Sequence, residues 1–388
     1  MPRLLHMADV HLGARHHDLG EAAVQQRERQ FAAFRRALDV AIDEGVDLVL
    51  VAGDLFDSNH QPRRLVERVA NEFRRLVLNG VPAVVLPGTH DVYDQASIYR
   101  TYDLPALAGL QAGSDALTVL TPDRVEAVYP ALDLVVHGRC FPTKRAPASP
   151  LAGFSIGHGA QWHVGLVHGS LRIPGRVEQD DVLFTEEEVA VCGLDYLALG
   201  HWHSARSGRA GPTTWAYAGA VEPMAVDQEG AGAVALVTLE EVDGERRVLL
   251  ERRRVGRTKF RRLDLDASEV PSQGRLVDRL RALADPDLVL EVRLTGIEPD
   301  TLDLNDDEVA QLLGGAFFRY RIRNATVPPP LEGPRPPADT IAGAFVEDLE
   351  RKIQAAEDAG RHEAAADLRE SLRLGRLLLE DPNAVQLA

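Results

Sequence analysis

Histidines and aspartates of the kinds that bind metal ions follow five short apolar stretches in the first 203 residues. In an extended segment, residues i and i+2 point the same way, so both members of an Asp-x-His or His-x-His pair can reach one centre. Each group alone is a weak signal, whereas five in order, each after an apolar run, are a strong one. The groups are Asp9-Val10-His11, Gly53-Asp54, Gly88-Thr89-His90-Asp91, His168-Gly169 and Gly200-His201-Trp202-His203.

The mixture of carboxylates and imidazoles in these groups indicates a site for transition-metal ions. Such ligands suit Mn²⁺, Fe²⁺ or Zn²⁺, whereas sites made only of oxygen atoms favour Mg²⁺ or Ca²⁺. Two such ions about 3.5–4 Å apart can hold a phosphodiester and generate a hydroxide nucleophile between them. A bridging aspartate is a simple way to hold two cations so close, and Asp54 is the natural candidate.

The elements that must position these groups alternate between strand-like and helix-like patterns, which is typical of a layered α/β domain. Ligands at the carboxyl ends of successive strands converge on one rim of such a sheet. We expect amphipathic helices at about 24–45 and 63–78, and a closing hairpin that turns at Asp243-Gly244. The predicted strands cover residues 3–7, 47–52, 83–86, 132–136, 164–167, 196–199, 234–239 and 248–255.

The sequence pattern divides the chain into four parts. Residues 1–256 form the predicted metal-dependent domain, and residues 257–327 have the pattern of a small, separate α+β unit. The proline-rich run 328–338 is a linker that is stiffened toward polyproline II. Residues 339–388 have the apolar spacing of two amphipathic helices separated at Gly360, which predicts a helical hairpin.

The ordered series of metal-binding groups resembles the signature of the calcineurin-like metallophosphoesterases. The opening stretch 5–13 and the segment 217–223, Tyr-Ala-Gly-Ala-Val-Glu-Pro, resemble SbcD and the YhaO-type DNA repair exonucleases in particular. The resemblance covers roughly residues 1–255 by motif and the rest by layout only. It implies a layered calcineurin-like α/β core, in which a sheet sandwich is flanked by helices, with a small α+β capping domain and a C-terminal helical hairpin.

The resemblance also implies a role for each matching residue. His90 would be the catalytic histidine that stabilises the transition state or protonates the leaving oxygen, and Asp91 would orient it through a hydrogen bond. The cofactors would be two divalent metal ions, with manganese (Mn²⁺) the expected metal. Asp54 would bridge the two ions, with Asp9, His11 and His203 on the first and His168 and His201 on the second.

Thr89 departs from the family pattern Gly-Asn-His-Asp/Glu, in which the asparagine side-chain oxygen binds the second metal. A threonine hydroxyl can coordinate a metal, but it is shorter and a poorer donor than an amide oxygen. We therefore expect weaker binding of the second metal, by the roughly 10–100-fold typical of disturbed metal shells.

The leading interpretation of function is a metal-dependent DNA nuclease, working as an exonuclease subunit in DNA repair. The resemblance implies DNA as substrate and an SbcC-like SMC ATPase as partner, bound through the C-terminal helices. It also implies a homodimer, because SbcD-like nucleases commonly dimerise.

Two alternatives remain open because of composition and because of Thr89. The net charge of -16 argues against a protein that coats nucleic acid by bulk electrostatics, and the aromatic content of 5% offers few rings for base stacking. A phosphodiesterase or phosphatase that acts on nucleotides, phosphoproteins or lipids is one alternative. A binding subunit with an impaired second metal site is the other.

The expected location is the cytoplasm, with no membrane partner. No apolar run approaches the roughly 20 residues that span a bilayer, and the N-terminus lacks the apolar region of a signal peptide. The two cysteines, Cys140 and Cys192, are too few for a disulfide framework, and reduced thiols are the simplest interpretation.

Overall fold

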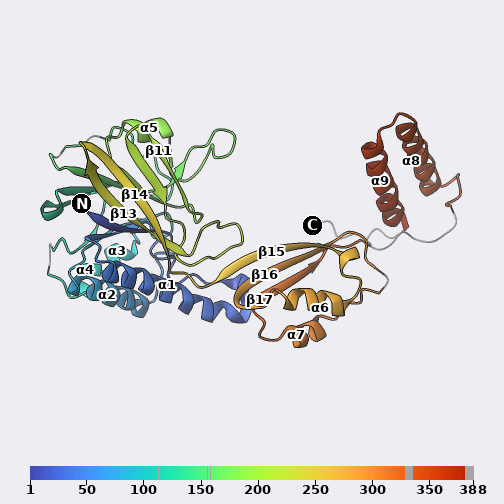
Figure 1. Cartoon of the computed structure of the whole chain (residues 1–388), viewed down its shortest axis with the longest axis horizontal. Helices are drawn as coiled ribbons and strands as arrows, with labels where there is room; N and C mark the ends of the chain where they lie inside the picture. Colours follow the sequence, from blue (N-terminus) through green and yellow to red (C-terminus); the bar gives the residue numbers. More distant parts are fainter. Residues whose placement is uncertain (112–113, 155, 158, 300, 328–334, 381–388) are drawn as a thin grey trace. The chain divides into compact units, whose positions relative to one another are not determined.

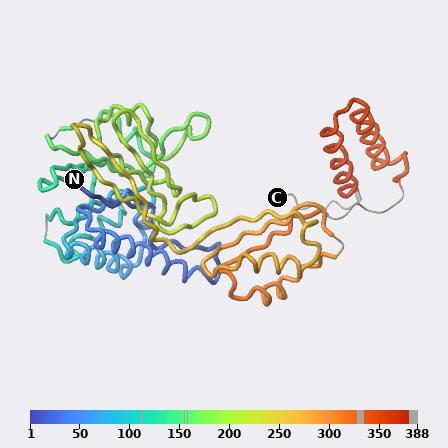
Figure 2. The backbone as a smooth tube through the Cα atoms, viewed as in Figure 1, coloured from blue at the N-terminus to red at the C-terminus, as the bar shows by residue number. Residues whose placement is uncertain are grey.

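The computed structural model describes residues 1–111, 114–154, 156–157, 159–299, 301–327 and 335–380. It separates into two compact units, Met1–Phe260 and Arg261–Ala388 (Figure 1, Figure 2). The sequence placed the corresponding boundary after residue 256. Of the predicted linker 328–338, residues 328–334 lie outside the described residues, as do residues 381–388 of the predicted C-terminal segment.

Two six-stranded sheets, counted over the described residues, build the first unit. Their strand orders are β14-β13-β1-β2-β3-β4 and β11-β12-β10-β7-β6-β5. The strands of the first sheet are β1 (Arg3–Met7), β2 (Leu48–Ala52), β3 (Ala83–Leu86), β4 (Leu117–Val119), β13 (Ala233–Val242) and β14 (Glu245–Arg254). Those of the second are β5 (Glu126–Tyr129), β6 (Leu134–Gly138), β7 (Trp162–His168), β10 (Tyr196–Gly200), β11 (Arg206–Ala210) and β12 (Thr213–Tyr217).

Strand β2 shows why the sequence of this unit folds into layers. All five of its residues are apolar and buried, because both faces of the strand are covered. Leu48 and Leu50 pack in the cluster between the two sheets, whereas Val49 and Val51 pack in the cluster beneath the helices. This alternation follows from the two-residue period of a strand.

Helices cover the outer faces of both sheets. On the first sheet, α1 (Ala23–Asp43) and α2 (Arg63–Leu78) pack through Phe34 and Phe73, whose rings meet edge to face at 5.6 Å. On the second, α5 (Glu186–Val191) begins with a capping box formed by Thr185 and Glu188. The shorter elements are η1 (His17–Ala22), α3 (Ile98–Thr101), α4 (Leu104–Leu107), η2 (Pro130–Leu132), β8 (Ser170–Leu171) and β9 (Leu183–Phe184).

The closing hairpin forms where the sequence predicted it. Strands β13 and β14 pair antiparallel, and β13 also pairs antiparallel with β1. Asp243 and Gly244 have φ of 56° and 79°, the two positive values that a type I′ hairpin turn needs.

The topology brings the five predicted metal-binding groups to one place. Strands β1, β2 and β3 pair parallel as neighbours in one sheet, and β7 and β10 pair parallel as neighbours in the other. The carboxyl ends of the three strands therefore share one edge, and so do those of the other two. The imidazole of His168, at the end of β7, lies 3.0 Å from the carbonyl oxygen of Ala52 at the end of β2, so the two edges meet.

The second unit contains a three-stranded sheet in the order β15-β16-β17, with helices packed on a core that includes Leu276, Leu290 and Val309. A separate pair of helices follows, in which Phe345 packs closely against Gly375. This helical hairpin turns at Gly360, as the sequence predicted. The elements are β15 (Lys259–Asp266), η3 (Ala267–Glu269), α6 (Gln273–Arg281), β16 (Asp285–Thr295), α7 (Asp306–Leu313), β17 (Phe317–Asn324), α8 (Ile341–Asp358) and α9 (His362–Glu380).

None of the helices among the described residues is both long enough and apolar enough to cross a membrane.

His6 is a core residue of strand β1. Its side chain is fully buried, and its Nδ1 lies 2.8 Å from the hydroxyl of Tyr196 on β10. Burial lowers the pKa of His6 from 6.5 to about 3, because a charged imidazole would lose its hydration between the sheets.

We expect the free energy of unfolding to fall as the pH drops below 6.5. In this range His6 becomes protonated in the unfolded chain but stays neutral in the folded protein. The loss attributable to His6 is about 1.4 kcal/mol per pH unit between the two pKa values. Urea denaturation of the wild type and of His6→Gln at about pH 7.5 and about pH 5.5 measures it. The wild type should lose about 1.4 kcal/mol more than the variant; equal losses would contradict the assignment.

Candidate metal centre

Five of the predicted ligands, Asp9, His11, Asp54, His168 and His203, lie together where the edges of the two sheets meet, and the ring of His201 lies against that of His168. Ligand atoms of Asp9, His11 and His203 lie within 4.8 Å of one another, and so do those of Asp9, Asp54 and His168. Asp9 belongs to both groups, so the two sets of ligands adjoin. The arrangement has the side chains that two neighbouring cation sites would need.

The backbone at the ligands is held in an unusual conformation. Asp9, His11 and Asp54 have φ of 51°, 48° and 52°, and His201 has φ of 102°, which is rare for residues other than glycine. The N–H groups of Val10 and His11 both donate to the carbonyl oxygen of Asp54 at 2.9 Å. These hydrogen bonds tie the loop after β1 to the loop after β2, so that the surrounding structure maintains the strained backbone.

In each of the carboxylates of Asp9 and Asp54, one oxygen accepts a hydrogen bond from a backbone N–H and the other points toward the candidate metal centre. Asp9 Oδ1 accepts from the His201 N–H at 2.9 Å, and Asp54 Oδ1 accepts from the His90 N–H at 2.8 Å. Asp9 Oδ2 is buried without a hydrogen-bond partner among the described residues. Asp54 Oδ2 lies 3.1 Å from His168 Nε2 and 3.7 Å from His11 Nε2. Both of these oxygens lie where a cation could bind them.

Two glycines are required by how closely the ligands pack. Gly53 has φ of 86°, and a Cβ there would lie 2.2 Å from Nδ1 of His168. A Cβ on Gly88 would lie 2.2 Å from Oδ1 of Asp54. A side chain at either position would displace a candidate ligand.

The imidazoles of His11 and His203 face each other in the first group of candidate ligands. Their Nε2 atoms face each other at 3.0 Å, a separation at which they can share only one proton between them. Gln228 holds the ring of His203, since its Nε2 lies 2.8 Å from His203 Nδ1 and its Oε1 accepts from the Met224 N–H at 2.7 Å. Two facing imidazole nitrogens beside the unpartnered Asp9 Oδ2 fit a divalent cation.

His168 presents one nitrogen to the second group. Its Nδ1 must donate to the Ala52 carbonyl, so Nε2 is the atom that faces Asp54. Burial lowers the pKa of His168, but the charge and hydrogen bond of Asp54, the charge of Asp9 and the Ala52 carbonyl together outweigh burial and raise the pKa to about 9. A metal ion that binds here at neutral pH must therefore displace a proton. The Thr89 hydroxyl lies 3.5 Å from His168 Nε2, within the same group.

His201 is oriented by a carboxylate that the sequence did not reveal. Its ring meets that of His168 edge to face at 5.2 Å, and its Nε2 lies 3.1 Å from Oδ2 of Asp180. A carboxylate only accepts, so Nε2 carries the proton and Nδ1 remains available to a metal. Asp180 also accepts from the hydroxyl of Ser170. Burial raises the pKa of Asp180, but Ser170 and the charge of His201 outweigh it and lower that pKa, which keeps Asp180 ionised.

His90 is the candidate residue most open to solvent, with 44% of its side chain exposed. Its Nδ1 donates to the carbonyl oxygen of Asp57 at 3.0 Å, which leaves Nε2 free. The Asp57 carboxylate lies 3.4 Å from Nδ1 of His11, so this residue contacts both histidines. Asp57 is not among the residues predicted from the sequence, although it lies in the same loop as Asp54 and has a metal-binding side chain.

The predicted hydrogen bond from Asp91 to the His90 imidazole is wrong. Asp91 is fully buried and accepts from the N–H groups of Gly88 and Phe56 and from the hydroxyl of Tyr99, at 2.7, 3.1 and 2.6 Å. Buried N–H groups require acceptors, and these two backbone donors determine where the carboxylate points. Asp91 therefore holds the loops that carry Asp54 and His90, without touching the imidazole.

Comparison with known proteins identifies the class. Residues 2–205 match the family model for calcineurin-like phosphoesterases, which is more than half of the chain. The chain belongs to the calcineurin-like phosphoesterase family.

Several relatives are named as DNA repair proteins. The DNA double-strand break repair protein Mre11 of Aeropyrum pernix is 29% identical over 245 residues, covering 59% of this chain and 55% of that protein. Mre11 of Halobacterium salinarum is 25% identical, covering 81% and 76%. The metallophosphoesterase YhaO of Bacillus subtilis is 24% identical, covering 51% and 48%. The chain thus spans about half the length of the Aeropyrum and Bacillus relatives. These relatives confirm the resemblance to the SbcD and YhaO type.

Among solved structures, the protein TT1561 of Thermus thermophilus matches 66% of this chain and 99% of its own, with a TM-score of 0.42 and 12% identity.

We expect Asp180→Asn to weaken binding of the more weakly held metal ion by about 10–100-fold, because His201 loses the carboxylate that fixes its tautomer. Calorimetric titration of the metal-free protein with Mn²⁺ measures this directly. Glu178→Gln, an exposed acid of the same loop that pairs with Arg172, is the matched control. Equal Mn²⁺ affinities for the wild type and Asp180→Asn would show that Asp180 does not orient a ligand.

Proposed function

We propose that the chain is a DNA nuclease that hydrolyses phosphodiester bonds with two divalent metal ions, Mn²⁺ foremost. The observation that carries the proposal is the pair of adjoining ligand groups that share Asp9, beside a histidine open to solvent. The relatives named for DNA double-strand break repair support DNA as the substrate.

The ligands of the ions are proposed as the sequence predicted, with Asp54 bridging. When bound, the two ions would polarise the phosphodiester and supply a hydroxide nucleophile. Asp9 and Asp54 direct their remaining oxygens toward the centre because backbone N–H groups occupy the others. His201, with its proton held at Nε2 by Asp180, would bind through Nδ1.

His90 is proposed as the catalytic histidine. Its exposed ring is held at Nδ1 by the Asp57 carbonyl, so Nε2 remains available to a substrate. From there it can stabilise charge on the phosphate or give a proton to the leaving oxygen.

The rest of the chain is proposed to serve the same activity. Residues 257–327 would act as a capping domain that guides DNA to the metal centre. The helices α8 and α9 would bind an SbcC-like SMC ATPase in the cytoplasm, and the nuclease would act as a homodimer. The net charge of -16 favours a second candidate, a phosphodiesterase or phosphatase whose substrate is not a nucleic acid.

We expect the purified protein to degrade DNA in the presence of Mn²⁺, and His90→Ala to reduce the rate by at least about 100-fold. Labelled single- and double-stranded DNA incubated with each protein measures this. His60→Ala, which changes an exposed histidine nearby, is the control and should retain the wild-type rate. A His90→Ala protein that degraded DNA as fast as the wild type would overturn the proposal. Turnover of bis-p-nitrophenyl phosphate without DNA cleavage would establish the second candidate instead.

Replacing Thr89 by asparagine should strengthen the second metal site. The buried Thr89 hydroxyl is a short, weak ligand beside His168, and an amide oxygen reaches further. We expect Thr89→Asn to raise the affinity for the second Mn²⁺ by about 10-fold and to raise activity when Mn²⁺ is limiting. Titration calorimetry and rates at sub-stoichiometric Mn²⁺ measure both effects.

Bound metal well below two equivalents in the wild type, without turnover in excess Mn²⁺, would favour a binding subunit.

A further inference from the structure

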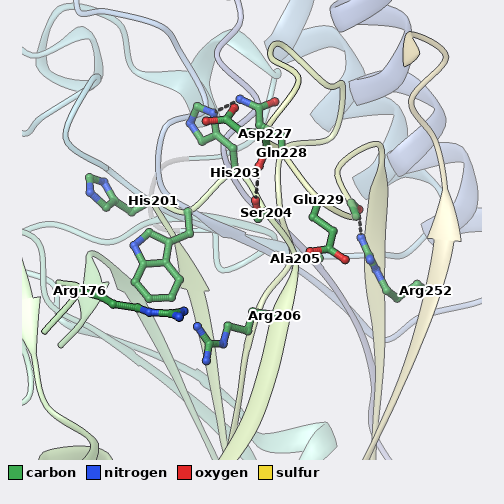
Figure 3. A pocket seen from close by; sticks show the side chains of 12 residues that line it. Arg176, His201, His203, Ser204, Ala205, Arg206, Asp227, Gln228, Glu229 and Arg252 are labelled. Atoms are coloured by element: carbon green, nitrogen blue, oxygen red, sulfur yellow. Dashed lines mark hydrogen bonds between the residues drawn. The ribbon is translucent and has the colours of Figure 1, made fainter. Parts of the chain in front are cut away.

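A cleft of about 870 Å³ opens beside the last metal-binding motif. His201 and His203 line it, together with three arginines, Arg176, Arg206 and Arg252 (Figure 3). The cleft therefore joins the candidate metal centre to a surface that carries positive charge.

Two of these arginines have no acidic partner. In Figure 3, the side chains of Arg176 and Arg206 reach toward each other inside the cleft. Among the described residues, no carboxylate forms an ion pair with either guanidinium, although the neighbouring Arg172 is paired with Glu178. The same cleft is also lined by two acidic residues, Asp227 and Glu229.

Arg252, by contrast, is engaged with the protein. Its guanidinium donates to the carbonyl oxygen of Gly230, so its hydrogen-bonding capacity is partly used. Arg176 and Arg206 are both exposed and keep their donors free.

The wall beside this pair is rigid. The indole of Trp202 stacks on the ring of Tyr217, with centroids 4.5 Å apart and planes 16° apart. Its N–H donates to the Ser170 hydroxyl at 2.8 Å. The guanidinium of Arg206 lies 6.0 Å from the centre of the indole, at the outer limit of a cation–π contact. Trp202, which stands between His201 and His203 in the sequence, therefore offers a fixed aromatic surface beside Arg206.

Two neighbouring guanidinium groups without a counterion repel each other, and an anion held between them removes the repulsion. Phosphate suits this position best, because guanidinium groups bind its oxygens in a planar, two-pronged geometry. The pair lines the same cleft as His201 and His203, two of the proposed metal ligands, so a phosphate bound by the arginines would lie beside the metal centre.

We propose that Arg176 and Arg206 form a subsite for a phosphate of the DNA strand next to the phosphate that is cleaved. This inference rests on the proposed nuclease function. A DNA strand carries a phosphate at every nucleotide, so a strand bound at the metal centre can place its next phosphate in the cleft. The subsite would distinguish an oligonucleotide from a small phosphodiester with a single phosphate.

Binding and cleavage of DNA test the proposal separately. The double variant Arg176→Ala/Arg206→Ala, made in the His90→Ala protein so that DNA is not consumed, should bind a short fluorescein-labelled single strand about 10-fold more weakly. The dependence of log K on log salt should become shallower by about 0.7 for each phosphate that the variant no longer neutralises. Fluorescence anisotropy at several salt concentrations measures both. Arg172→Ala, which removes a paired arginine of the same loop, is the matched control and should leave both values unchanged.

In the protein with His90 intact, the double variant should lower kcat/KM for the oligonucleotide by about 10-fold relative to kcat/KM for bis-p-nitrophenyl phosphate. The loss should appear as a higher KM for the oligonucleotide. If the wild type cleaves DNA and the double variant binds it equally well, the subsite is wrong and the nuclease proposal stands. If the wild type cleaves no DNA but the double variant still binds it more weakly, the nuclease proposal fails and the phosphate subsite stands. Equal losses on both substrates would also overturn the subsite.

Discussion

The site depends on hydrogen bonds that join the ends of different strands. The N–H groups of Val10 and His11 donate to the Asp54 carbonyl, and the carboxylates of Asp9 and Asp54 accept from the N–H groups of His201 and His90. Each bond links one metal-binding motif to another, and together they connect both sheets. The ligands are therefore positioned before any cation arrives, and the strained backbone at Asp9, His11 and Asp54 persists because these bonds determine it.

The same construction concentrates negative charge in the interior. Asp9, Asp54 and Asp91 are all buried, and burial together with the charge of Asp54 raises the pKa of Asp91. Buried carboxylates are costly unless cations or donors compensate them. Burial lowers the pKa values of His11 and His168, but the nearby aspartates outweigh it and raise both pKa values, which favours the protonated imidazoles that compensate the carboxylates. Divalent cations would replace those protons, which couples metal binding to pH.

Outside the centre, charge is distributed unevenly. The chain carries a net charge of -16, yet the cleft beside His201 and His203 contains two arginines without acidic partners among the described residues. A strongly acidic chain can thus offer a local positive surface next to a metal centre. This arrangement suits a protein that binds phosphate groups at one site and does not attract nucleic acid over its whole surface.

The amino-acid sequence alone predicts the type and order of the candidate ligands, since apolar runs such as 48–52 predict buried strands and neighbouring parallel strands end at one edge. It also predicted the β13–β14 hairpin from Asp243-Gly244 and the helical hairpin from its apolar spacing. Tertiary structure alone decided which groups orient the ligands. Asp180 and Gln228 lie in irregular loops, where no periodic pattern predicts the path of the chain. The direction of the Asp91 side chain depends on backbone N–H groups that need an acceptor, such as that of Gly88. The positions of the strands along the chain follow from local hydrophobic pattern, whereas the order of the strands in each sheet and the hydrogen-bond partners of each ligand depend on contacts between distant segments.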